Sequence, residues 1–203
     1  MVEVKICGLT TVDDALRCID AGADALGLNF WPGSPRCVDL EVAGQIVDAC
    51  GERATMVGVF VDFTLQQVRE ILRETETSWA QLHGGEPPSL VAELLPHAYK
   101  AIGVKDGSAI DAARQYPGEH LLLDASVPGM PGGTGRTFDW AIAAAVAKER
   151  KLTLAGGLTP DNVAEAVRTV RPFRVDVASG VESAPGQKDP DLVRRFIEAA
   201  KVE

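Results

Sequence analysis

Short apolar segments recur about every 20–30 residues along the whole chain, and this regularity limits the possible folds more than any other feature. Between them lie stretches with helical periodicity, such as the apolar stripe of Val12, Ala15 and Ile19. Eight segments are expected to be strands, at 2–7, 25–30, 56–61, 79–82, 98–104, 120–124, 152–155 and 173–177. Eight strand–helix units of about 25 residues each predict an α/β protein with a (β/α)8 TIM barrel.

The main alternative fold is an open, doubly wound sheet, which usually has fewer strands. No GxGxxG follows the first predicted strand, so the commonest dinucleotide-binding form of that fold is not indicated. No linker divides the chain, so one domain is expected over 1–203. The longest irregular stretch, 125–136, is rich in glycine and proline, and loops of this length are usually functional. We therefore expect Gly132, Gly133, Thr134 and Gly135 to belong to a lid loop.

Helix-start signals fall where this arrangement needs them. Thr11 and Thr64 are each followed, three residues later, by an acidic or amide residue, as in a capping box. Thr159-Pro160 and Asp189-Pro190 resemble an N-cap residue followed by proline at the first helical position. The last of these signals predicts a closing helix over about 190–200.

The charge and cysteine content exclude several classes of protein. The chain has 20 Lys and Arg against 29 Asp and Glu, which gives a net charge of −9 and predicts no binding to nucleic acid or to an anionic membrane. No apolar run reaches the roughly 18 residues of a membrane helix, and the N-terminal residues do not resemble a secretory signal. The four cysteines include no CxxC pair or zinc-site spacing, so we expect reduced thiols, a cytoplasmic protein and no metal.

Candidate catalytic residues lie at the carboxyl ends of the predicted strands, where barrel enzymes carry their active sites. Cys7 shares the polar face of the first strand with Glu3 and Lys5, so its thiol should sit at the barrel mouth. It is either a general base or a small side chain that fills space. Asp124 ends the apolar run 121–123 and is either a general acid or a turn-forming residue.

Two glycine-containing loops after strands seven and eight suggest an anion site. Gly156, Gly157, Ser179 and Gly180 lie there, and glycines allow backbone N–H groups to approach a phosphate closely. The alternative is that these glycines only make tight turns. Since both loops lie in corresponding positions, phosphate binding is the favoured interpretation.

Two further residues have open roles at this stage. Arg36 lies in a proline-containing loop and is either a surface charge or a fork for a carboxylate ligand. His83 follows the fourth strand and is either an internal hydrogen-bonding residue or part of the site.

Together these motifs resemble the phosphoribosylanthranilate isomerase family of tryptophan biosynthesis, in the family's order and over almost the whole chain. One departure is Ala178, where the family often has a second serine, and another is Gln187 within the usual Gly-x-Lys-Asp pattern. The matching segments are Lys5-Ile6-Cys7-Gly8-Leu9-Thr10, Ser34-Pro35-Arg36, Val57-Gly58-Val59-Phe60, Gln81-Leu82-His83-Gly84, Leu122-Leu123-Asp124, Gly132-Gly133-Thr134-Gly135, Phe138-Asp139-Trp140, Leu154-Ala155-Gly156-Gly157-Leu158, 175–182 and 186–189.

The resemblance implies an aldose–ketose isomerase that performs an Amadori rearrangement of N-(5-phosphoribosyl)anthranilate without a cofactor. It implies that Asp124 is the general acid and Cys7 the general base. Arg36 would hold the anthranilate carboxylate, Asp176 would contact a sugar hydroxyl, and His83 is grouped with these substrate-binding residues. The phosphate would bind at Gly156, Gly157, Ser179 and Gly180.

Two other functions remain as alternatives. The related phosphosugar isomerase of histidine biosynthesis carries an aspartate at the end of strand one and a half-barrel repeat, whereas this chain has Cys7 and no such repeat. A non-catalytic barrel that binds a phosphorylated ligand would need neither Cys7 nor Asp124. The expected partner is a small phosphorylated substrate, and the chain is expected to be a monomer or a homodimer.

Overall fold

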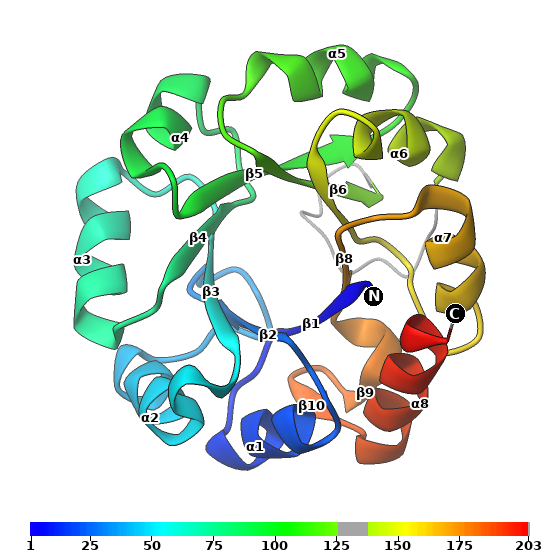
Figure 1. Cartoon of the computed structure of the whole chain (residues 1–203). Helices are drawn as coiled ribbons and strands as arrows, with labels where there is room; N and C mark the ends of the chain where they lie inside the picture. The colour runs from blue at the N-terminus through cyan, green and yellow to red at the C-terminus, as the bar shows by residue number, and fades with distance from the viewer. Residues whose placement is uncertain (126–137, 203) are drawn as a thin grey trace.

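Eight parallel strands form a closed ring in the computed structural model, which describes residues 1–125 and 138–202 (Figure 1). Each strand pairs with the next in the chain, and the eighth pairs with the first to close the barrel. The strands are β1 (Glu3–Cys7), β2 (Ala25–Asn29), β3 (Thr55–Phe60), β4 (Trp79–Leu82), β5 (Ala98–Val104), β6 (His120–Ala125), β7 (Lys151–Leu154) and β8 (Arg174–Val177). The predicted (β/α)8 barrel is confirmed, and every predicted strand is present.

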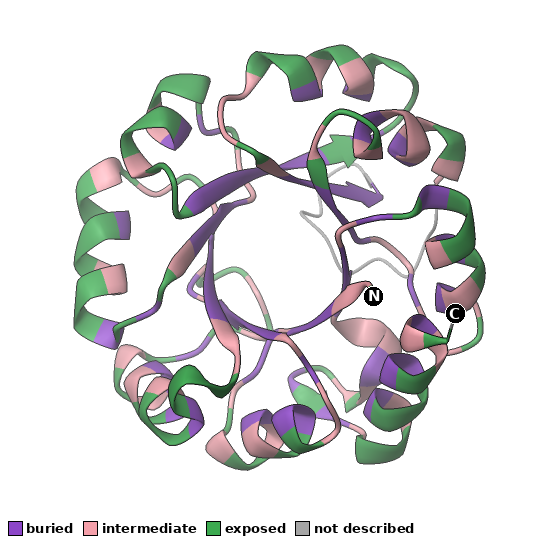
Figure 2. Cartoon of the chain, in the orientation of Figure 1, coloured by how far each residue is buried: buried purple, intermediate pink, exposed green. Residues whose placement is uncertain are grey.

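Helices surround the barrel and cover its outer face (Figure 1). They are α1 (Val12–Asp20), α2 (Leu40–Cys50), α3 (Leu65–Thr75), α4 (Pro88–Leu94), α5 (Ser108–Gln115), α6 (Trp140–Ala147), α7 (Val163–Val170) and α8 (Pro190–Lys201). Figure 2 shows buried residues concentrated in the strands and on the inner sides of the helices, with exposed residues on the outer sides. The main core therefore lies between the strand ring and the helix ring.

Alternation along β1 separates this apolar layer from a polar barrel interior. Val4 and Ile6 are fully buried in the core that includes the helices. Lys5 is also fully buried, but its Nζ points inward and donates to Gln81 Oε1 of β4 and Asp176 Oδ1 of β8. The predicted inward direction of the polar face of β1 is confirmed.

Most predicted helix starts are correct, and one is wrong. Thr11 caps α1, Thr64 forms a full capping box with Gln67, and Asp189 caps α8. The helix predicted to start at Thr159-Pro160 instead begins at Val163. The side-chain oxygen of Asn162 accepts the Thr159 N–H at 2.8 Å, so residues 159–162 form a turn that precedes the helix.

Several smaller elements complete the chain, and the first lies where Ser179-Gly180 is expected to open a short helical turn after the eighth strand. A short helical turn, η2 (Ser179–Val181), follows β8 and leads into a hairpin of β9 (Glu182–Ala184) and β10 (Gln187–Lys188). Another turn, η1 (Gly51–Arg53), follows α2. The proposed lid residues Gly132, Gly133, Thr134 and Gly135 lie outside the described residues.

All four cysteines are free thiols in this structure. Within residues 1–125 and 138–202, none of the helices combines the length and apolar character needed to cross a membrane.

Candidate active site

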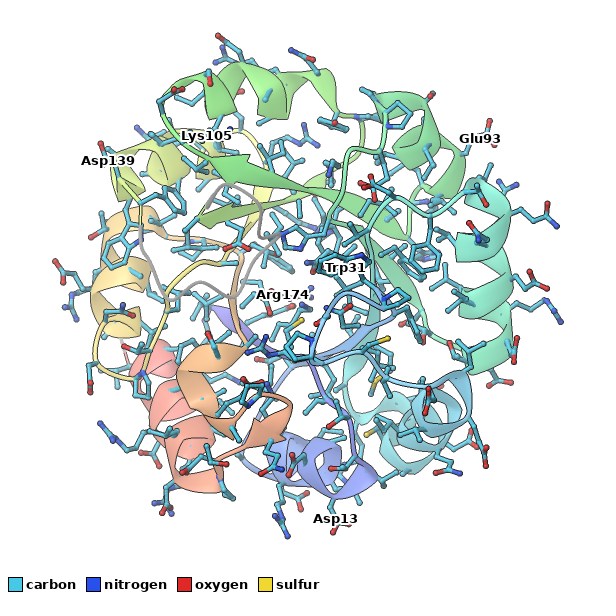
Figure 3. The ribbon with its side chains drawn as sticks, turned by 180° about the vertical axis from the view of Figure 1, so that it is seen from behind. Asp13, Trp31, Glu93, Lys105, Asp139 and Arg174 are labelled. Carbon is cyan, nitrogen blue, oxygen red and sulfur yellow. The ribbon has the colours of Figure 1, made fainter. Side chains whose placement is uncertain are left out.

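A cavity of about 470 Å³ opens at the carboxyl ends of the barrel strands. In Figure 3, Trp31 from the loop after β2 lies over the centre of the ring, whereas Asp13 and Glu93 point outward from the helices. The cavity brings together every described residue that the sequence predicted for the site. These residues are Cys7, Arg36, His83, Asp124, Gly156, Gly157, Asp176, Ser179 and Gly180.

Cys7 ends β1 and presents its thiol to this cavity. A Cβ atom placed on Gly27 of β2 would lie 2.5 Å from Cys7 Sγ, so the neighbouring strand has no room for a side chain at that position. Burial raises the pKa of the Cys7 thiol, and the nearby charge of Lys5 opposes this effect without cancelling it. In the ligand-free protein the thiol is therefore mainly protonated at neutral pH.

Asp124 reaches the same cavity from β6, with 6% of its surface exposed. Its Oδ2 lies 3.4 Å from Nε2 of His83, which follows β4. A Cβ atom on Gly156 would lie 2.8 Å from Asp124 Oδ1. The carboxyl group is therefore confined between the His83 ring and the backbone of the loop after β7.

A chain of buried polar groups crosses the barrel beneath the cavity. Lys5 Nζ is 3.0 Å from Asp176 Oδ1 and 3.1 Å from Gln81 Oε1. Tyr99 OH donates to the same Gln81 oxygen at 3.0 Å, and Gln81 Nε2 lies 3.0 Å from His83 Nδ1. Burial alone would lower the pKa of Lys5, but the Asp176 carboxylate raises it above its usual value, so Lys5 is a fixed cation in the barrel interior.

Arg36 lies in the wall of the cavity and is held by an acidic residue far along the chain. Its Nε and Nη2 donate to the two carboxylate oxygens of Glu182 at 2.8 and 2.7 Å. Lys188 Nζ also donates to Glu182, at 2.7 Å, and to the Cys7 carbonyl oxygen at 2.7 Å. This cluster ties the hairpin of β9 and β10 to the end of β1.

The loops after β7 and β8 provide tightly packed backbone at one end of the cavity. Gly156 and Gly157 have φ angles of +92° and +63°, which side-chain-bearing residues rarely adopt. A Cβ atom on Gly180 would overlap the carbonyl oxygen of Leu158, so the two loops pack directly against each other. This close approach depends on the absence of side chains at the glycines, whose backbone lies at the cavity.

Several supporting residues were not assigned a role from the sequence. Lys5, Gln81, Glu182 and Lys188 hold the predicted residues in place, and Trp31 lines the cavity. The inward face of β1 was a usable signal for Lys5. Glu182 and Lys188 gave no comparable signal, because their partners are 146 and 181 residues away in the sequence.

Comparisons with known proteins agree over the full chain. Residues 4–199 match the family model described as N-(5'phosphoribosyl)anthranilate (PRA) isomerase. The N-(5'-phosphoribosyl)anthranilate isomerase of Geobacter sulfurreducens is 49% identical over 201 residues, which cover 99% of each chain. The crystal structure of phosphoribosyl anthranilate isomerase from Thermotoga maritima has a TM-score of 0.89 and 39% identity, again covering 99% of each chain.

One solved structure contains a bound ligand. It is a phosphoribosyl anthranilate isomerase in complex with reduced 1-(o-carboxyphenylamino)-1-deoxyribulose 5-phosphate, with a TM-score of 0.86, 37% identity and 99% coverage of both chains. The family model and the relatives span nearly all of this chain at well over 30% identity. The chain therefore belongs to the N-(5'-phosphoribosyl)anthranilate isomerase family.

Proposed function

We propose that this protein converts N-(5-phosphoribosyl)anthranilate into 1-(2-carboxyphenylamino)-1-deoxyribulose 5-phosphate, a step of tryptophan biosynthesis. The observation that carries the proposal is the position of Cys7 and Asp124, which reach one cavity from two separate strands. The same cavity contains an arginine and two glycine-containing loops for the substrate's two anionic ends. An Amadori rearrangement only moves protons, so an acid, a base and anchoring groups are sufficient for it.

Asp124 acts as the general acid in the first step. Its carboxyl group donates a proton to the furanose ring oxygen, and the bond between that oxygen and the anomeric carbon breaks. The nitrogen lone pair forms a C=N bond to the anomeric carbon, which gives an open-chain Schiff base. Confinement of the carboxyl group between His83 and Gly156 supports this role, because proton transfer requires a fixed donor position.

Cys7 acts as the general base in the second step. Its thiolate removes the proton from the adjacent sugar carbon, the electron pair moves toward the iminium nitrogen, and the resulting enolamine tautomerises to the ketone. Because burial raises the pKa of this thiol, the thiolate is a minor but strongly basic form. The positive charge of Lys5 supports the role because it opposes the effect of burial.

Arg36 binds the anthranilate carboxylate through the edge of its guanidinium group that Glu182 leaves free. Glu182 occupies the edge formed by Nε and Nη2, and a guanidinium group has five N–H donors in all. The edge formed by Nη1 and Nη2 therefore remains for the substrate. Glu182 is buried and pairs with both Arg36 and Lys188, so its carboxylate stays in place. Arg36 is therefore held in a fixed direction.

Backbone N–H groups of the loops containing Gly156, Gly157, Ser179 and Gly180 bind the phosphate. Their small side chains and close packing allow an anion to reach the backbone, as in other barrels. Asp176 contacts a sugar hydroxyl from the barrel floor, where Lys5 holds its carboxylate. These anchors bind parts of the substrate that do not react and position the reacting carbons between the acid and the base.

Turnover of purified protein, followed by the fluorescence of the anthranilate group, tests the proposal. We expect Cys7→Ala and Asp124→Asn each to lower kcat by about 10²–10⁴-fold, the usual contribution of an acid or base, while product binding persists. Arg36→Ala should mainly raise KM. Near-normal turnover in either of the first two variants would remove that residue from its role.

The same assay separates the alternative activities. The proposal would be contradicted if the protein turned over only the phosphosugar substrate of the histidine pathway. Binding of the anthranilate substrate without turnover would also contradict it. Cytoplasmic location and a monomeric or homodimeric state remain predictions, and light scattering of the purified protein tests the second.

A further inference from the structure

We infer that Gln81 is a positioning residue that keeps His83 neutral, with its single ring proton on Nε2, the ring nitrogen that lies near Asp124. The inference rests on the proposed function, because its catalytic consequence concerns Asp124 as the general acid. It follows from counting the hydrogen-bond donors and acceptors along the buried chain from Lys5 to Asp124.

The orientation of the Gln81 side-chain amide is fixed by Lys5. Gln81 is 1% exposed, and its side chain faces Lys5 Nζ at 3.1 Å and Tyr99 OH at 3.0 Å. An ammonium group has only donors, so the amide group that faces it must be the oxygen. A flipped amide would place an NH₂ group against the ammonium group at about the same 3.1 Å, which is too close for a water molecule to lie between them. The amide therefore has one allowed orientation.

The orientation of Gln81 determines the tautomer of His83. With Oε1 directed at Lys5, the Nε2 amide group lies 3.0 Å from His83 Nδ1. An amide nitrogen only donates, so Nδ1 must accept and cannot carry a proton. The single proton of the neutral ring is then on Nε2, and Nε2 lies 3.4 Å from Asp124 Oδ2. A second proton on the ring would set an N–H of His83 against an N–H of Gln81.

A neutral His83 ring matters for the role of Asp124 as the general acid. Among the described side chains, Asp124 supplies the one carboxylate within 4.0 Å of a His83 ring nitrogen, and Lys5 reaches the ring only through Gln81. A doubly protonated ring would form an ion pair with the Asp124 carboxylate and hold it in its charged form. Neutral His83 packs beside the carboxyl group and leaves it able to carry the proton that opens the sugar ring.

The tautomer can be measured in the unmodified protein. The chain has three histidines, and the ¹⁵N signals of His83 in ¹⁵N-histidine-labelled protein are those that disappear in His83→Asn. Near neutral pH we expect Nε2 to give the signal of a protonated nitrogen and Nδ1 that of an unprotonated one. A protonated Nδ1 in the ligand-free protein would overturn the inference, whether or not the protein turns over its substrate.

The variant Gln81→Glu keeps the shape of the side chain and replaces the donor with an acceptor. We expect His83 to gain a proton on Nδ1, and kcat to fall by about 10²-fold, the lower end of a general acid's contribution, with KM changed less than about threefold. Gln81→Asn, which withdraws the amide group from the ring, should give a mixture of tautomers and an intermediate kcat. It replaces Gln81→Glu if that variant fails to fold.

Tyr99→Phe is the matched control, since Lys5 alone still fixes the amide orientation. It removes one hydrogen bond to the same oxygen, and we expect it to leave both the His83 signals and kcat unchanged. If His83 gains the Nδ1 proton in Gln81→Glu and kcat is unchanged, the proposed effect of Gln81 on catalysis is refuted. A change of tautomer in Tyr99→Phe would refute the role of Lys5.

Discussion

Replacing Gly156 with alanine tests whether the loop after β7 positions the catalytic carboxyl group. The new Cβ atom would overlap the backbone nitrogen of Ala125 and lie 2.7 Å from its Cβ atom and 2.8 Å from Asp124 Oδ1. These neighbours belong to β6 and the general acid, and the backbone of a barrel strand cannot move away easily. Gly156→Ala should therefore impair both stability and catalysis.

The size of the effect follows from two contributions. A side chain at φ +92° costs about 1–2 kcal/mol, and crowding by an added methyl group in a packed region costs about 1–3 kcal/mol. A total of about 2–5 kcal/mol corresponds to a decrease in Tm of about 4–20 °C for a chain of this size. Displacement of a catalytic group by about 1 Å lowers the rate by about 10²-fold, so kcat should fall by a similar factor.

Gly44→Ala is the control for this experiment. Gly44 lies inside α2, has an ordinary φ angle, and a Cβ atom there meets nothing within 4 Å. Because alanine favours helix over glycine by about 1 kcal/mol, Tm should rise by about 2–4 °C with kcat unchanged. Thermal unfolding and the anthranilate fluorescence assay measure both quantities. If Gly156→Ala matches the wild type in Tm and kcat, the argument that this loop positions Asp124 is wrong.

Three further predictions concern the charged groups of the site. Lys5→Met should move the pH midpoint of Cys7 alkylation upward, because the charge of Lys5 lowers the Cys7 pKa and so opposes the effect of burial. The experiment uses a Cys37→Ser background, which removes the exposed thiol, and an unchanged midpoint would contradict the prediction. Glu182→Gln should raise KM about tenfold, equivalent to about 1.4 kcal/mol, by releasing Arg36, and an unaltered KM would argue against the assigned binding edge. Burial alone would raise the pKa of Glu182, but its cationic partners hold it below its usual value, so its stabilising effect is present above about pH 4.3 and is lost as pH falls through the lower folded-state pKa. The difference in unfolding free energy between wild type and Glu182→Gln should therefore shrink between pH 7 and pH 3, as urea titrations can measure.

Sequence patterns were sufficient where the cause is local. The alternation of residues along β1 identified Lys5 and Cys7 as inward-facing, because successive side chains of a strand point to opposite sides. The cap of α8 was equally readable, since Asp189 accepts the N–H groups of the two residues after Pro190. The start of α7 was misplaced because residues 159–162 form a turn before the helix, in which Thr159 Oγ1 accepts the Asp161 N–H and Asn162 Oδ1 accepts the Thr159 N–H.

By itself, the sequence determined the eight-unit barrel and the strand ends at which Cys7 and Asp124 lie, because periodicity and turn residues act over a few positions. Only the tertiary structure decided how these residues are held. Closure of the ring brings Lys5 to Gln81, 76 residues later, and Arg36 to Glu182, 146 residues later. The direction of a buried proton depends on which donors and acceptors meet in space, and that meeting exists only once the barrel has closed.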